Sequence, residues 1–171
     1  MPTTVAELNA GDRAAFVAAL GRLFEHSPWV AEESFERRPF RDAADLHAEL
    51  CATVRRAPPE KQLALIRSHP DLAGRLAAAG QLTPESAREQ AGAGLDRLSS
   101  GEMAEFQRWN AAYRERFGFP FVICARLSDR RVILAALRAR LENPPDREHA
   151  AALAEIDKIA WLRLQDALKV P

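Results

Sequence analysis

The sequence predicts an all-α protein, with a single domain over residues 1–171 built as a bundle of about seven to nine helices and one short extended segment near residues 119–125. Alanine, leucine and arginine are abundant, and all three favour helix. Apolar residues recur at helical spacing, for example at Phe16, Leu20 and Leu23. No internal repeat, low-complexity linker or shift in composition marks a second domain.

Proline and apolar spacing define the elements of the first half of the chain. Ser27 followed by Pro28 is typical of an N-cap with proline at the first helical position, so a helix is expected to begin there. Later helices carry apolar residues three or four apart, namely Leu46, Leu50 and Val54 and then, beyond Pro58 and Pro59, Leu63 and Ile66. The glycine-flanked stretch 74–80 is expected to be poor in regular structure.

The second half begins with a similar signal, because Thr83 and Pro84 predict a capped helix start. A long helix is expected over residues 101–117, with Phe106, Trp109, Tyr113 and Phe117 on one stripe. The run 119–125 is strand-like, but the proline within it favours an extended segment. Two further helices are expected, over residues 129–141 and 146–169.

Charge and cysteine usage exclude several classes of protein. Lys plus Arg and Asp plus Glu each number 24, so the net charge of zero argues against nucleic-acid binding and gives no polybasic membrane anchor. No apolar run approaches the roughly 18 residues of a membrane span, and the first residues lack the apolar core of a signal peptide. Cys51 and Cys124 form no CxxC pair, which favours a reducing compartment. We therefore expect a cytoplasmic protein.

His69 is the first candidate for chemistry. It precedes Pro70 and lies close to Asp71, in a predicted break between helices. Histidine titrates near neutrality and suits proton transfer. The alternative is a histidine that caps the end of its own helix.

Ser86, Glu89 and Gln90 are spaced to share one helix face, where a hydroxyl, a carboxylate and an amide could bind a urea-like ligand. The alternative is a solvated face with a Ser–Glu capping contact. The extended run 117–126 has main-chain groups that need partners, supplied either by a ligand or by other chain segments. Arg163 lies on or beside an apolar stripe and there needs a carboxylate, from the protein or from a substrate, unless its side chain reaches the surface.

Signals for metals and nucleotide cofactors are absent. His47 and Cys51 are four residues apart, but the other histidines complete no known ligand motif. The chain contains neither GxGxxG nor GxxxxGK[ST], and no GxSxG nucleophile motif. We expect neither a metal nor a cofactor.

Taken together, five motifs resemble the 2-oxo-4-hydroxy-4-carboxy-5-ureidoimidazoline (OHCU) decarboxylases of urate breakdown. They are SPWVAE (27–32), SHPDLAG (68–74), LTPESAREQAGAGL (82–95), FGFPFVICAR (117–126) and EIDKIAWLRL (155–164). The resemblance spans nearly the whole chain, and the order and spacing of the motifs are more specific than any one of them. It implies an all-helical, cofactor-free carboxy-lyase, commonly a homodimer, that forms (S)-allantoin from a small ureidoimidazoline.

The resemblance also implies roles for individual residues. The histidine of HPDL, here His69, is the acid/base, and Glu89 and Arg163 complete the polar site. The residues expected to line the substrate are Pro70, Ser86, Ala87, Arg88, Glu89, Gln90, Phe121, Val122, Ile123, Cys124 and Ala125. Our hypothesis is that His69 moves the proton of the substrate hydroxyl and ring while Glu89 orients it or the ureido arm. Arg163 would pair with Glu89 or a substrate oxygen.

Two alternative functions are also compatible with the sequence. One is a non-catalytic helical module that binds a partner helix or a purine-derived ligand, which predicts an exposed apolar groove. The other is a hydrolase of a related ureido compound, which releases ammonia or urea instead of CO2.

Overall fold

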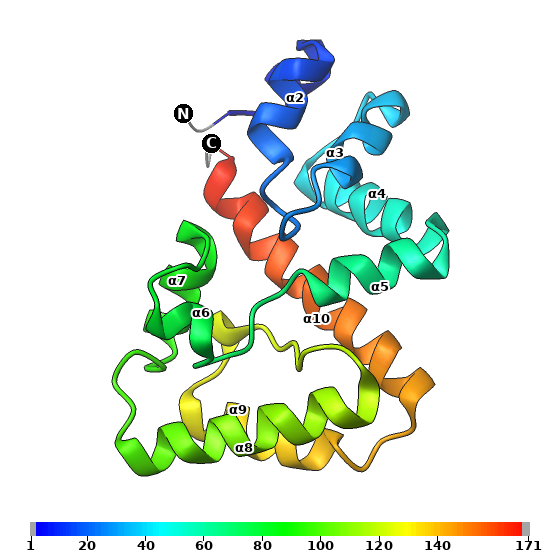
Figure 1. Ribbon diagram of the computed structural model, residues 1–171. Coiled ribbons are helices and arrows are strands. Elements are labelled where there is room, and N and C mark those ends of the chain that lie inside the picture. Colours follow the sequence, from blue (N-terminus) through cyan, green and yellow to red (C-terminus); the bar gives the residue numbers. More distant parts are fainter. Residues whose placement is uncertain (1–2, 169–171) are drawn as a thin grey trace. The chain divides into compact units, whose positions relative to one another are not determined.

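The computed structural model describes residues 3–168, with the side chain of Leu76 excepted, and these residues form helices without a strand (Figure 1). The α-helices are α1 (Val5–Ala10), α2 (Arg13–Leu20), α3 (Trp29–Ser34), α4 (Ala43–Arg56), α5 (Pro59–Arg67), α6 (Arg75–Ala78), α7 (Pro84–Gly92), α8 (Ser100–Phe117), α9 (Arg130–Arg140) and α10 (Pro145–Ala167). The turns η1 (Phe35–Arg37) and η2 (Ala125–Leu127) are 3-10 helical. The all-α prediction is confirmed, and seven of these α-helices have eight or more residues.

Side-chain caps explain where most helices begin. The N-cap residues that accept a first-turn backbone N–H are Thr4, Asp12, Asp42, Thr83, Ser99 and Asp129. Thr83 with Pro84 at the first helical position matches the prediction. The predicted start is one residue too early, since Pro28 and not Ser27 is the N-cap of α3, whose first residue is Trp29. The Ser27 hydroxyl is used elsewhere, donating to the main-chain oxygen of Glu25 at 2.8 Å.

The contacts divide the chain into two compact units. Unit 1 contains the residues up to Ser68 together with those from Asp157 onward. Within it, α3 packs against both α2 and α4. Its core is apolar, and the largest fully buried side chains are Phe16, Leu20, Phe24, Leu46, Leu50, Leu65 and Ile66. Burial of this size is the main favourable term in folding.

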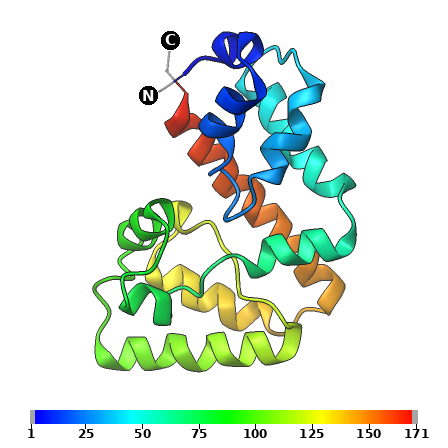
Figure 2. The ribbon, with the colours of Figure 1, turned by 45° about the horizontal axis from the view of Figure 1, so that its top comes forward.

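Unit 2 runs from His69 to Ile156. Its helices α8 and α9 lie side by side, and α7 packs against η2 (Figure 1 and Figure 2). The predicted aromatic stripe of α8 faces this core, with Phe106 and Tyr113 fully buried. The Tyr113 ring lies 5.4 Å from that of Phe121, so the stripe contacts the extended segment directly.

That segment joins α8 to η2. Gly118 ends α8 in the left-handed conformation, with φ of 75°, which glycine adopts without strain. Residues 120–124 form neither helix nor strand, as the proline suggested. Cys124 has an extended backbone, and Ala125 already begins the 3-10 turn. The stretch 74–80 was predicted to be poor in structure, but it contains the short helix α6.

The predicted end of the last helix, at Lys169, lies outside the described residues. Within them, α10 runs to Ala167. Within the part of the chain that is described, no helix combines the length and the apolar character needed to cross a membrane.

Candidate active site

His69 lies where the sequence predicted, just beyond the end of a helix. α5 ends at Arg67, Ser68 is its C-cap, and His69 is the next residue. The His69 side chain is buried, with 6% of its surface exposed, and Pro70 is half-buried. A buried imidazole in an irregular segment is suited to selective proton transfer, because the fold and not bulk water controls its environment.

The turn that follows, Pro70–Gly74, has a specific backbone shape. Ala73 has a φ of 53°, in the left-handed region that few non-glycine residues adopt. A Cβ atom at Gly74 would lie 2.7 Å from the Cβ of Asp71, so only glycine fits there without a shift. The DLAG part of the motif therefore encodes the shape of the turn.

α7 presents its predicted face inward. Ser86 and Gln90 are buried and Glu89 is half-buried, whereas Ala87 and Arg88 are exposed. The alternative of a solvated face is therefore wrong for Ser86 and Gln90. The Gln90 amide holds the turn, since its Oε1 accepts from the Ala73 N–H at 3.0 Å and its Nε2 donates to the Asp71 oxygen at 3.4 Å.

The extended segment has its main chain bound by side chains of neighbouring helices. Arg140 Nη1 donates to the Val122 oxygen at 2.7 Å, and Glu155 Oε2 accepts from the Cys124 N–H at 3.0 Å. The Arg140 guanidinium also lies over the Phe121 ring, 4.5 Å from its centre. Other chain segments thus satisfy part of the main-chain hydrogen bonding of this run. This was one of the two interpretations, the other being a bound ligand. Sequence reasoning missed both of these charged partners.

Behind the segment lies a buried charge network that the sequence did not indicate. Glu148 is fully buried and accepts from Tyr113 Oη at 2.5 Å, Asn143 Nδ2 at 2.8 Å and Arg140 Nη2 at 2.8 Å. Burial alone would raise the pKa of Glu148, but the bonds from Arg140, Asn143 and Tyr113 outweigh it and hold the pKa below its ordinary value. Burial and the hydrogen bond to Glu148 raise the pKa of Tyr113. The network therefore contains a carboxylate and a neutral phenol.

The segment and α7 approach each other within unit 2. Burial raises the pKa of the Cys124 thiol, and the charges of Glu155 and Glu89 raise it further. The Glu89 carboxylate is therefore near enough for its charge to act on Cys124. The structure thus brings together three predicted features in one unit: the turn after His69, the inner face of α7 and the segment 121–125, of which only Ile123 is not fully buried.

Arg163 belongs to unit 1, on the last part of α10. It is buried, and its Nη1 donates to Glu25 Oε2 at 3.0 Å. The interpretation of Arg163 as a residue that reaches the surface is wrong, and a carboxylate beside it was expected. Glu25 itself was missed, because an acidic residue after the apolar pair Leu23–Phe24 is only a weak signal.

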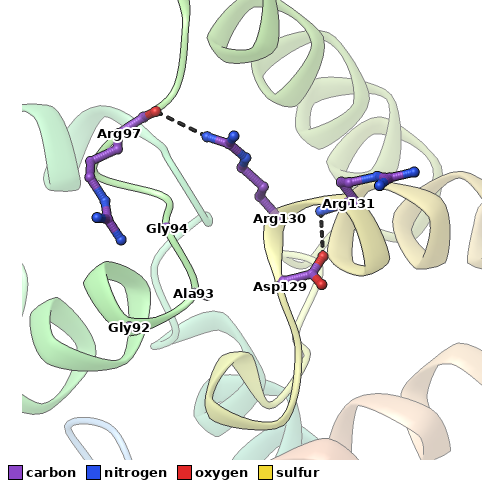
Figure 3. Close-up of a pocket in the computed structure, with 7 residues that line it drawn as sticks. All are labelled: Gly92, Ala93, Gly94, Arg97, Asp129, Arg130 and Arg131. Carbon is purple, nitrogen blue, oxygen red and sulfur yellow. Dashed lines mark hydrogen bonds between the residues drawn. The ribbon is translucent and has the colours of Figure 1, made fainter.

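A pocket of about 420 Å³ lies beyond the end of α7 (Figure 3). It is lined by Gly92, Ala93, Gly94, Arg97, Asp129, Arg130 and Arg131. Arg130 Nη1 donates to the Arg97 oxygen at 3.1 Å, and Asp129 caps the first turn of α9. Two of its arginines form salt bridges with carboxylates, Arg130 with Glu102 and Arg97 with Asp96. None of the predicted site residues lines this pocket.

His47 and Cys51 lie together on α4, but their surroundings disfavour a metal ion. His47 Nε2 lies 2.8 Å from the Asp157 oxygen and 3.4 Å from Cys51 Sγ. Burial, reinforced by Asp157, raises the pKa of the Cys51 thiol, which disfavours the thiolate that binds metals. Among the described residues there is no group of three His, Cys, Asp or Glu side chains placed to hold a metal ion.

Comparison with known proteins identifies the family. A family model described as OHCU decarboxylase matches residues 9–165. The chain belongs to the OHCU decarboxylase family. It is 43% identical over 165 residues to a 2-oxo-4-hydroxy-4-carboxy-5-ureidoimidazoline decarboxylase of Amia calva, covering 96% of this chain and 94% of that protein. A decarboxylase of the same name from Mus musculus is 43% identical over 162 residues, covering 95% and 91%.

Solved structures agree with this assignment to the OHCU decarboxylase family. A crystal structure of (S)-allantoin synthase is similar with a TM-score of 0.77 and 30% identity over 98% of this chain. This chain spans 54% of that protein's chain, or about half. A crystal structure of OHCU decarboxylase in the presence of (S)-allantoin gives a TM-score of 0.69 and 25% identity, covering 91% of this chain and 97% of that one.

Proposed function

We propose that this chain is the carboxy-lyase that converts OHCU to (S)-allantoin in urate degradation, a part of purine catabolism. The observation that carries the proposal is the family match over residues 9–165, which includes all five sequence motifs. That match runs through both units, which supports the prediction of one domain over residues 1–171.

The chemistry of the substrate explains the residue types. Its ring carbon with the hydroxyl and the carboxylate adjoins a C=N bond to the carbon with the ureido group. When CO2 leaves, the electron pair of the broken C–C bond forms a double bond between the two ring carbons, and the imine nitrogen takes up a proton. Loss of the hydroxyl proton then gives the ring carbonyl, and one proton must be added to one face of the ureido carbon. The imine accepts the electrons, so the proposal needs neither a metal nor a cofactor.

We assign the proton transfers to His69, with Glu89 as the group that orients it or the ureido arm. A positioned acid/base contributes roughly 10²–10⁴-fold to rate. The burial of His69 and the half-buried position of Glu89 on α7, beside the buried Ser86 and Gln90, support these roles. Arg163 is assigned to a substrate oxygen, with Glu25 holding its guanidinium in place.

Substrate recognition is assigned to the three features gathered in unit 2. Main-chain amides of residues 121–125, apart from that of Cys124, which donates to Glu155, would bind the ring carbonyls and stabilise the enolate-like charge. Ser86 and Gln90 would bind the ureido group, with Pro70, Ala87 and Arg88 beside it. Gln90 has two amide hydrogens and two oxygen lone pairs, and its two bonds to the turn use half of that capacity.

We further propose that the protein works in the cytoplasm as a homodimer, with a small-molecule substrate and no nucleic-acid or membrane partner. The net charge of zero supports the last two points. Sedimentation of the purified chain tests the oligomeric state, and a monomer at micromolar concentration would contradict it.

The function is tested by forming OHCU in place from urate with the two preceding enzymes and following (S)-allantoin by circular dichroism. We expect the chain to accelerate formation of the signal, and His69→Ala to lose roughly 10²-fold or more of that acceleration. Unchanged kinetics with the wild-type chain would reject the function, and an active His69→Ala variant would reject the role of His69. Release of ammonia or urea instead of CO2 would identify a ureido hydrolase.

A further inference from the structure

The turn Pro70–Gly74, which directly follows His69, is held by side chains from two helices. Gln90 of α7 binds the Ala73 N–H and the Asp71 oxygen, at 3.0 and 3.4 Å. Asn110 Nδ2 of α8 donates to the Leu72 oxygen at 2.9 Å. Three consecutive residues immediately beyond the HP dipeptide are therefore each fixed by a side chain from elsewhere in unit 2.

A fourth contact comes from the next turn of α8. Arg114 Nε donates to both carboxylate oxygens of Asp71, at 2.9 and 3.0 Å. Asn110 and Arg114 are four residues apart and therefore lie on the same helix face. That face meets the turn with one neutral amide and one charged donor.

Asn110 is placed at a cost to stability. It is buried, with 5% of its surface exposed, and its Oδ1 has no hydrogen-bond partner among the described residues. A buried acceptor without a partner destabilises the fold, so packing alone would favour an apolar residue here. What the amide contributes instead is the hydrogen bond to the Leu72 main-chain oxygen, which holds the turn.

We propose that Asn110 and Arg114, together with Gln90, are positioning residues that fix the His69 imidazole by clamping the turn behind it. The inference rests on the proposed function in naming His69 as the acid/base. Proton transfer requires the acid/base within hydrogen-bond reach of its target, and a displacement of about 1 Å costs up to roughly 100-fold in rate. The left-handed Ala73 makes the turn a conformation that needs such support.

The test compares Arg114→Met and Asn110→Ala with the control Arg116→Met. Arg116 is an exposed arginine on the same helix that donates to the Asn143 oxygen instead of the turn. We expect kcat to fall roughly 10- to 100-fold in both clamp variants, with KM changed by less than about threefold, and to remain unchanged in the control. The Arg114→Lys variant should recover part of the loss because it keeps the charge opposite Asp71.

Two further readouts separate positioning from general destabilisation. The melting temperature of Arg114→Met should fall by no more than about 4 °C, because the Arg114–Asp71 pair is partly exposed and contributes little to stability. The ring resonances of His69, assigned by their loss in His69→Ala, should titrate differently in the clamp variants from the wild type. Folded clamp variants with wild-type kcat and wild-type His69 titration would overturn the proposal. If the wild-type chain shows no decarboxylase activity, the function fails, and the His69 titration still decides the clamp.

Discussion

The two irregular segments of unit 2 are both held by side chains, but by different physical means. The turn Pro70–Gly74 is bound by two neutral amides and a partly exposed ion pair. The segment 121–125 is bound by Arg140 and Glu155, and Arg140 belongs to a network around the fully buried Glu148. Buried ionic groups are costly to separate, whereas exposed pairs are cheap. Substitutions that release the segment should therefore mainly lower stability, and substitutions that release the turn should mainly lower activity.

The largest expected effect comes from removing the arginine of the buried network. Arg140→Met leaves Glu148 buried without its cation and the Val122 oxygen without its donor. We expect the free energy of unfolding in urea to fall by about 3–5 kcal/mol. The double variant Arg140→Met with Glu148→Leu should be less destabilised than Arg140→Met, since no uncompensated charge remains. A loss below about 1 kcal/mol in the single variant would show that the network does not hold the segment.

A smaller loss is expected from filling the space at Gly74. The Cβ of Gly74→Ala would lie 2.7 Å from the Cβ of Asp71, so the turn must shift. We expect a destabilisation of about 1–3 kcal/mol in thermal unfolding, together with a fall in kcat. Gly92→Ala is the matched control, because a Cβ there meets nothing within 4 Å and the residue lies in α7. That control should be neutral or slightly stabilising, and equal behaviour of the two variants would contradict the role of Gly74.

The smallest expected effect is a change in stability at acid pH. The pKa of Glu148 is lower in the folded chain than its ordinary value of 4.5, so ionised Glu148 adds stability above that value. This contribution is lost as the pH falls below 4.5 and through the lower folded pKa. Urea unfolding of wild type and Glu148→Gln at a series of pH values between roughly 3 and 7 measures it. The difference between the two proteins should shrink as the pH falls, and a constant difference would contradict the pKa direction.

Local signals made much of the fold predictable. Thr83 with Pro84, the long helix ending before Gly118 and the position of His69 beyond α5 each follow from a cap, a spacing or a proline a few residues away. Leu23 shows the limit of such spacing. It continues the apolar pattern of α2 and is buried, but the helix ends at Leu20 and Leu23 lies in the turn beyond it.

The site was predictable only in part, for a related reason. His69, Ser86, Glu89 and Gln90 lie in motifs whose residue types suggest chemistry. The residues that hold Arg163, the turn Pro70–Gly74 and the segment 121–125 in place are ordinary polar residues of helices or turns, namely Glu25, Asn110, Arg114, Arg140, Glu148 and Glu155. Only tertiary contacts, spanning for example the 138 positions between Glu25 and Arg163, give these residues their roles. Spacing along one helix carries no information about such partners.

The role of His69 in delivering the proton is tested most directly by the enantiomeric composition of the allantoin formed from freshly generated OHCU, measured with wild type and with folded His69→Ala. We expect (S)-allantoin in large excess with the wild type and, with the variant, a nearly racemic product at close to the uncatalysed rate. An (S)-excess from His69→Ala equal to that of the wild type, formed at a similar rate, would show that another group delivers the proton.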